Sequence, residues 1–67
     1  MKVYGLCTET TGKTLTLWCI GERNGVPGTA QERNYVTTYY SDIDKAKWAY
    51  RVSKEHLGPD YTCVDNT

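Results

Sequence analysis

The stretch SDIDKAKWAYRVSKEHLG, residues 41–58, predicts one amphipathic helix and decides the fold class of this 67-residue chain. Ser41 is a favourable N-cap with Asp44 three residues later, and Gly58 followed by Pro59 ends the helix. At about 100° per residue, one side of the helix carries small and apolar side chains. They are Ile43, Ala46, Ala49, Tyr50, Ser53 and Leu57. We expect this side to pack against the rest of the domain.

The opposite side of the same helix carries Trp48 and Val52, which are four residues apart and therefore neighbours on the helix surface. Lys45 and Arg51 frame this pair. An apolar centre with a charged rim is typical of a protein contact, in which Trp and Arg are over-represented. We therefore predict that Trp48, Val52, Lys45 and Arg51 bind a partner. Three covers for the patch stay open: the chain's own segment 21–34 or its C-terminal tail, a second copy, or a different protein.

Four segments rich in β-branched and aromatic residues predict strands around this helix. They are KVYGLC (2–7), KTLTLWCI (13–20) and NYVTTYY (34–40) before it, and DYTCVDN (60–66) after it. The order β-β-β-α-β predicts an α+β fold, with one helix packed on a face of an antiparallel sheet. We expect a single small domain, 1–67, from which the segment 21–34 protrudes as a loop.

The first two strands are expected to form a hairpin, in which Gly12 closes a three-residue TTG loop as a type I turn with a G1 bulge. In this register Cys7 lies opposite Leu15, and Gly5 lies opposite Leu17. One face is then wholly apolar, with Val3, Gly5, Cys7, Leu15, Leu17 and Cys19. A shift by one residue would mix the two faces, so this pattern favours the register given.

Four aromatic residues then share the other face of the predicted sheet, namely Tyr4, Trp18, Tyr35 and Tyr39. Aromatic platforms on sheets can stack nucleic-acid bases, but these platforms lie in basic surroundings. Here eight Lys and Arg balance eight Asp and Glu, and the net charge is zero. We therefore predict a second surface for a protein partner or for self-association, and nucleic-acid binding is disfavoured.

The residues that carry chemistry are few. Cys7, Cys19 and Cys63 are far apart without a CxxC pair, and His56 is the single histidine. A zinc site from these four residues, or a Cys–His catalytic pair, is an alternative to the simpler interpretation of reduced, buried thiols. Hydrolase and phosphate-binding motifs are missing from the sequence. We expect no enzyme activity, metal, cofactor or small-molecule substrate.

The sequence shows no run near the roughly 20 apolar residues that cross a bilayer. The residues after Met1 also lack the apolar core of a signal peptide. We therefore expect a cytoplasmic protein without membrane contact.

The strand–helix–strand end of the chain, residues 39–48 and 61–64, resembles small phage accessory proteins, among them podovirus inhibitors of host RNA polymerase. This resemblance implies a protein that binds a host protein in the host cytoplasm and inhibits or redirects it. The β-β-β-α order with the helix KAKWAYRVSKEH also resembles the amino-terminal arm-binding domain of phage integrases. That second resemblance implies nucleic-acid binding, although such sheets are rich in Lys and Arg and this one is rich in Thr and Tyr.

Overall fold

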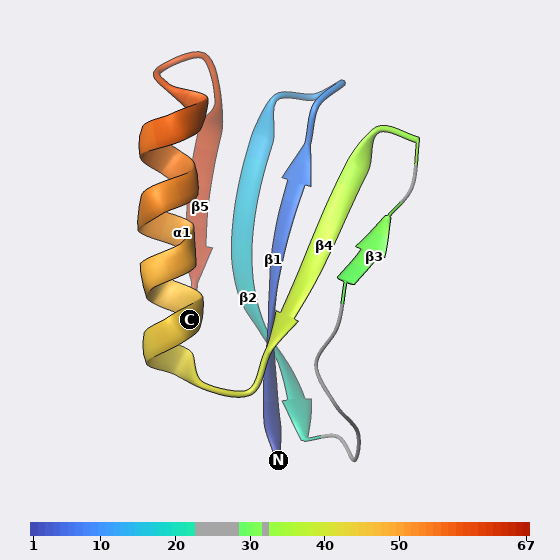
Figure 1. Ribbon diagram of the computed structural model, residues 1–67, viewed down its shortest axis with the longest axis vertical. Helices are drawn as coiled ribbons and strands as arrows, with labels where there is room; N and C mark the ends of the chain where they lie inside the picture. Colours follow the sequence, from blue (N-terminus) through green and yellow to red (C-terminus); the bar gives the residue numbers. More distant parts are fainter. Residues whose placement is uncertain (23–28, 32) are drawn as a thin grey trace.

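The structure, a computed structural model, describes residues 1–22, 29–31 and 33–67. Within them a five-stranded sheet carries one helix on one face (Figure 1), which confirms the α+β class. The elements are β1 (Lys2–Glu9), β2 (Thr14–Glu22), β3 (Thr29–Gln31), β4 (Tyr35–Tyr40), α1 (Ile43–Leu57) and β5 (Thr62–Asn66). The predicted order β-β-β-α-β therefore lacked one short strand, β3, which lies inside the segment 21–34.

The strand order across the sheet is β3-β4-β1-β2-β5. All pairs are antiparallel except β2 and β5, so the sheet is mixed and the expected antiparallel sheet is corrected. The helix connects two parallel strands, β4 and β5, and such a connection must cross over one face of the sheet. In Figure 1 the helix lies in front of the sheet, and the crossover has the usual right hand.

The core lies between α1 and the central strands β1 and β2. Its buried side chains are Tyr4, Leu6, Leu15, Leu17 and Ala46, and Tyr40, Ala49, Tyr50, Leu57 and Cys63 pack against them. Ala46 is 0% exposed, and its small side chain lets the helix come close to the sheet. Most of the predicted packing side of the helix is therefore confirmed. Ile43 is the exception, because it is 37% exposed in the first turn.

The hairpin register differs from the prediction by one residue. Leu6 lies opposite Leu17, and Glu9 lies opposite Thr14, so the loop between the strands has four residues. Lys13, with φ of 51°, takes the left-handed conformation that was expected of Gly12. This shift turns the side chains of Tyr4 and Leu6 toward the helix and that of Cys7 away from it, and it places Gly5 on the same face as Cys7. The structure thus buries the larger apolar side chains of β1, and buried apolar area stabilises a fold by roughly 25 cal/mol per Å².

The helix begins one residue later than predicted. Asp42, not Ser41, is the N-cap: its Oδ1 accepts a hydrogen bond of 2.8 Å from the backbone N–H of Asp44. Gly58 ends the helix as predicted, with φ of 80° and its N–H donating to the carbonyl of Lys54. These two caps leave fifteen residues, Ile43–Leu57, to span the sheet.

The segment predicted as a protruding loop, 21–34, is partly strand. Gly21 and Glu22 continue β2, and Thr29–Gln31 pairs with β4. Residues 23–28 and 32 of this segment lie outside the described residues. Val36 and Tyr40 point to the helix side of the sheet. Tyr35 and Tyr39 point, as predicted, to the other side, which we call the open face.

Candidate functional site

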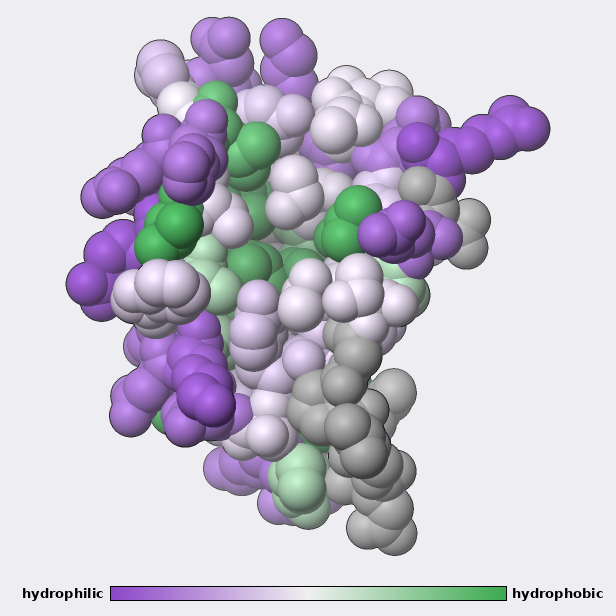
Figure 2. Space-filling model, in the orientation of Figure 1, coloured by the Kyte–Doolittle hydropathy of each residue, from purple (hydrophilic) through white to green (hydrophobic). Residues whose placement is uncertain are grey.

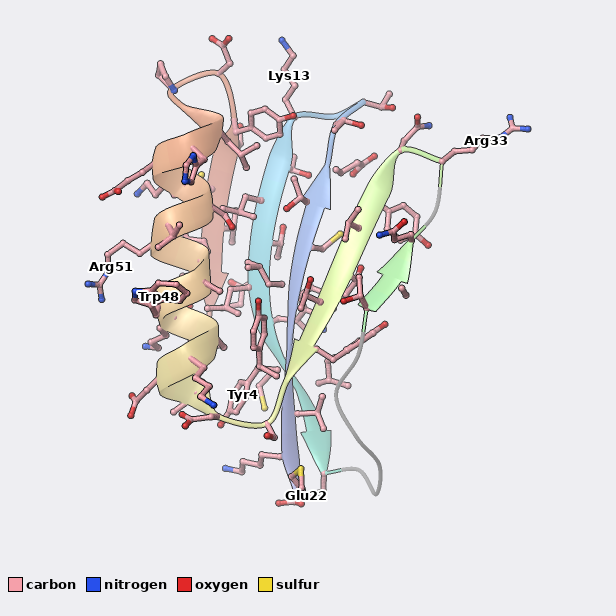
Figure 3. All side chains as sticks on the ribbon, in the orientation of Figure 1. Tyr4, Lys13, Glu22, Arg33, Trp48 and Arg51 are labelled. Atoms are coloured by element: carbon pink, nitrogen blue, oxygen red, sulfur yellow. The ribbon has the colours of Figure 1, made fainter. Side chains whose placement is uncertain are left out.

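Trp48 lies on the side of α1 that is turned away from the sheet. The helix packs on β1, β2 and β4, and Ala46 is the residue buried in that contact. Trp48 follows two positions later, on the opposite side of the helix, and 64% of its surface is exposed (Figure 3). Trp has one of the largest apolar surfaces of any side chain, so this exposure leaves a large area free for a contact.

Charged residues border Trp48 and the half-buried Val52. Lys45, Arg51 and Glu55 are exposed within one or two turns of them, and we call these five residues the Trp48 surface. The helix carries four Lys and Arg but two Asp and Glu, a net charge of +2, whereas the net charge of the whole chain is zero. Figure 2 shows this side of the helix as a small apolar area bordered by hydrophilic side chains. The four residues predicted as a helix contact are thus brought together.

An open groove adjoins the Trp48 surface, between the last turns of α1 and the start of β5. Arg51 and Glu55 line it on the helix, and Lys54 adds a second cation. The remaining wall comes from Gly58, Pro59, Tyr61 and Cys63. A carboxylate entering this groove would meet two cations, Arg51 and Lys54, and one carboxylate, Glu55, so the groove has a net charge of +1. The sequence does not indicate the groove. The groove forms where the helix lies next to β5, and the sequence pattern does not predict the position of that strand in the sheet.

The charges near the β5 edge are set by local contacts. Burial raises the pKa of the Tyr50 hydroxyl, with smaller contributions from Cys63 and Asp65. Thr67 donates hydrogen bonds to Oδ1 of Asp65 from its hydroxyl, at 2.6 Å, and from its backbone N–H, at 3.0 Å, and these lower the pKa of Asp65. At neutral pH Tyr50 is therefore uncharged and Asp65 is ionised. The positive charge of Lys47 also lowers the pKa of Asp65. Arg51 and Lys54 line the groove.

Two described strands, β3 and β5, belong to segments that could have covered Trp48, and neither lies over it. The strand of segment 21–34, β3, forms the sheet edge farthest from β5. The C-terminal residues Thr62–Asn66 form β5, which pairs with β2 and lies behind the helix in Figure 1. Neither strand crosses the outer side of α1. The part of the prediction that concerns residues 23–28 lies outside the described residues.

The four aromatic residues predicted to share one sheet face are separated. Trp18, Tyr35 and Tyr39 are at positions of the open face, and Tyr35 is 40% exposed. Tyr4 is instead in the core, with 9% of its surface exposed. This correction follows from the hairpin register: β1 is shifted by one residue against β2, and that moves Tyr4 to the helix side.

Gly5 allows Trp18 to lie across β1 on the open face. A Cβ atom placed on Gly5 would be 2.8 Å from Cη2 and Cζ2 of Trp18 and 3.0 Å from Cδ1 of Ile20. Tyr39 lies opposite Gly5 on the other neighbouring strand. Trp18, Ile20 and Tyr39 therefore meet around a glycine at one end of the open face. Sequence reasoning missed the role of Gly5 and Ile20 because it placed the glycine in the core.

The cysteines are free thiols on different parts of the sheet. Cys7 is half-buried at an open-face position, Cys63 is half-buried beside the core, and Cys19 is exposed. In the described part of the chain no group of three or more His, Cys, Asp or Glu side chains is arranged to hold a metal ion. The helix of the described residues is too short and too polar to cross a membrane.

Comparison of the chain with protein-family models, with curated proteins and with solved structures finds no match.

Proposed function

We propose that this chain is a small, non-catalytic protein-binding module that uses the Trp48 surface to dock a partner. The observation that carries the proposal is a tryptophan with 64% of its surface exposed, one turn from Val52, on a helix fixed by packing on its other side. An anchor on a rigid helix loses little conformational entropy on binding, and Trp and Arg are the residues that most often dominate such contacts.

The charge of the helix indicates the chemistry of the partner. The net charge of +2 on α1 and the two cations of the groove, Arg51 and Lys54, favour an acidic protein surface with an apolar recess for Trp48. By its resemblance to phage accessory proteins, we propose that this partner is a host protein and that the chain acts in the host cytoplasm. Binding there would inhibit or redirect the host protein.

The open face supports a protein partner over a nucleic acid. Among its described strand residues none is Lys or Arg, and Glu9 carries the one charge. A sheet that enters a DNA groove, as in the integrase resemblance, depends on cations that contact phosphates. Binding to DNA that weakens steeply with salt would favour that alternative function.

The test is the double variant Trp48→Ala with Val52→Ala, compared with Val36→Ala, which removes an exposed apolar side chain from β4. We expect the double variant to lose the partner that the unchanged protein captures from host lysate, because truncating an anchor costs about 2 kcal/mol or more in binding. Its melting temperature should fall by no more than about 4–8 °C, which corresponds to about 1 kcal/mol in a domain of this size, because Trp48 is exposed and Val52 is half-buried. The Val36→Ala variant should bind normally. A large loss of stability with unchanged partners would contradict the proposal.

A further inference from the structure

β5 (Thr62–Asn66) is an edge strand, and among the described strands only β2 pairs with it. Its other side is the outer edge of the sheet. Thr62 donates its backbone N–H to the carbonyl of Lys13 at 2.8 Å, so Thr62 directs its backbone groups to β2. This direction alternates along a strand, and Cys63 and Asp65 therefore direct their N–H and C=O groups to the outer edge.

The outer edge of β5 lacks the residues that usually keep such an edge from pairing. Natural edge strands often carry lysine or proline, which oppose the approach of another strand. Neither residue type occurs within Thr62–Asn66, and Asp65 is the one charged residue there. The carboxylate of Asp65 already accepts two hydrogen bonds from Thr67, at 2.6 and 3.0 Å. The sequence of β5 is therefore compatible with the addition of a further strand.

The helix α1 reaches over this outer edge. In Figure 1 it lies in front of β5 and extends beyond the side of β5 that is turned away from β2. The groove connects the two elements, because it is lined by Arg51 and Lys54 of the helix and by Tyr61 and Cys63. Neighbouring strands lie about 4.8 Å apart. A strand added to β5 would therefore lie beneath α1, with the helix covering one of its faces.

The flank of the helix above this edge carries a row of cations. Lys47, Arg51 and Lys54 are four and three residues apart, so they lie along one side of α1. Arg51 and Lys54 line the groove, and the charge of Lys47 acts on Asp65. Two carboxylates belong to the same site, namely Glu55 and Asp65. Three cations and two carboxylates give the site a net charge of +1, which favours an acidic ligand.

We propose that the outer edge of β5 binds an extended acidic segment of a partner protein, which adds to the sheet as an antiparallel strand beneath α1. In this mode of recognition, main-chain hydrogen bonds provide affinity and side-chain contacts provide specificity. Here the main-chain bonds are made by Cys63 and Asp65, and the cations of the helix select acidic side chains. The inference goes beyond the proposed function, because the edge is a separate contact that shares only Arg51 and Glu55 with the Trp48 surface.

The pairing specifies where the acidic residues lie in the bound segment. Cys63 is on the helix side of the sheet, so the residue opposite it, called i, points to the helix side as well. Residue i+2 lies next to Tyr61 on the same face, and both positions are close to Arg51 and Lys54. Residue i−2 lies opposite Asp65, where a second carboxylate would be destabilising. The segment recognised is therefore one with acidic residues at i and i+2 and an uncharged residue at i−2.

Peptide titration followed by NMR tests the proposal on the unchanged protein. The probe is a short acetylated and amidated peptide with Thr at i−2 and Glu at i and i+2. We expect the amide signals of Cys63 and Asp65 to shift most, because their N–H groups gain hydrogen bonds. The same peptide N-methylated at i−2 and i should bind at least about tenfold more weakly, since it has lost the pairing donors. A peptide with its two Glu side by side should bind about threefold more weakly, because only one of them faces the helix.

Three results of this titration would overturn the proposal. The first is equal binding of the three peptides, and the second is that the largest shifts fall on the open face. The third is that glutarate, a free dicarboxylate, shifts the same signals as much as the probe does. In that case the groove is a site for small anions, and strand addition does not occur.

Two variants at Asp65 test the backbone contact from the side of the protein. Asp65→Pro removes an outward N–H and leaves the pairing with β2 intact, and proline is tolerated where the N–H of an edge strand faces solvent. Asp65→Ala is the matched control, because it removes the same carboxylate and keeps the N–H. We expect Asp65→Pro to weaken peptide binding at least about tenfold and Asp65→Ala to leave it unchanged or tighter. Equal binding by the two variants would overturn the proposal, and the N-methylated peptide makes the same test if Asp65→Pro does not fold.

A second pair of variants tests the charge contact. Lys54→Glu reverses a cation of the groove, whereas Lys45→Glu makes the same change on the same helix outside the groove. At low salt we expect the peptide to bind about fivefold more weakly to Lys54→Glu and normally to Lys45→Glu. Equal weakening would indicate attraction to net charge and overturn the proposal.

The double variant Trp48→Ala with Val52→Ala separates the edge of β5 from the Trp48 surface. It should bind the peptide as the unchanged protein does, whatever it captures from host lysate. Loss of the peptide in this variant, with its fold intact, would place the contact on the Trp48 surface and overturn the proposal.

Discussion

Gly5 is the residue of β1 that leaves room for large neighbouring side chains on the open face. A glycine inside a strand is destabilising by itself, because it loses more backbone entropy on folding than other residues and has no side chain to pack. Here the space above it is occupied by the ring of Trp18 and the end of Ile20. Gly5 therefore stabilises the open face by leaving room for larger neighbours.

Replacing this glycine should destabilise the protein, in spite of the usual benefit of alanine over glycine in a strand. The new Cβ would be 2.8 Å from two ring atoms of Trp18, so the ring must move. We expect Gly5→Ala to lower the free energy of unfolding by about 1–3 kcal/mol, as measured by urea denaturation. The tryptophan fluorescence of the folded state should change as well.

The control for this change is Gly12→Ala in the hairpin turn. A Cβ on Gly12 would meet the flexible carboxylate of Glu9 at 3.5 Å, which is an ordinary contact, and Gly12 has no positive φ. Its effect should stay within about 0.5 kcal/mol. If Gly5→Ala proves as harmless as Gly12→Ala, Trp18 does not lie over β1.

At the scale of the elements, the helix presents Trp48 to solvent, and packing on the sheet holds the helix in place. Helix periodicity alone was sufficient to put Trp48, Val52, Lys45 and Arg51 on the outer side, because a helix that packs on one sheet must expose its opposite side. The hairpin was harder. A hairpin with a four-residue turn pairs its strands one position away from the register of a hairpin with a three-residue turn. This difference moved Tyr4 from the predicted contact surface into the core.

The start of the helix provides a test of this element. Asp42 caps it through the hydrogen bond from Oδ1 to the N–H of Asp44, and Ser41 lies outside the cap. Asp42→Ala should lower the free energy of unfolding by about 1 kcal/mol, because it leaves a backbone N–H without its partner. Ser41→Ala should have a much smaller effect in the same denaturation experiment. The reverse order of the two effects would assign the cap to Ser41, as the sequence pattern predicts.

At the scale of the whole molecule, the chain has two outward surfaces with different chemistry. The helix side is cationic around a tryptophan, and the open face carries one charge among its described strand residues, on Glu9 at the end of β1. A domain of this length buries only about 60% of the surface of its unfolded chain, so each surface left exposed by the helix and the sheet is large for the size of its core.

The sequence by itself determined the α+β class, the end of the helix, its start to within one residue, and the helix side that carries Trp48. These features depend on local signals: caps, the 3.6-residue period and β-branched runs. Only the tertiary structure decided the hairpin register, the burial of Tyr4, the edge position of β5 and the open face around Cys7. The physical reason is that these depend on which side chains fill the space under one helix, and Leu6 and Tyr4 fill it better than Gly5 and Cys7.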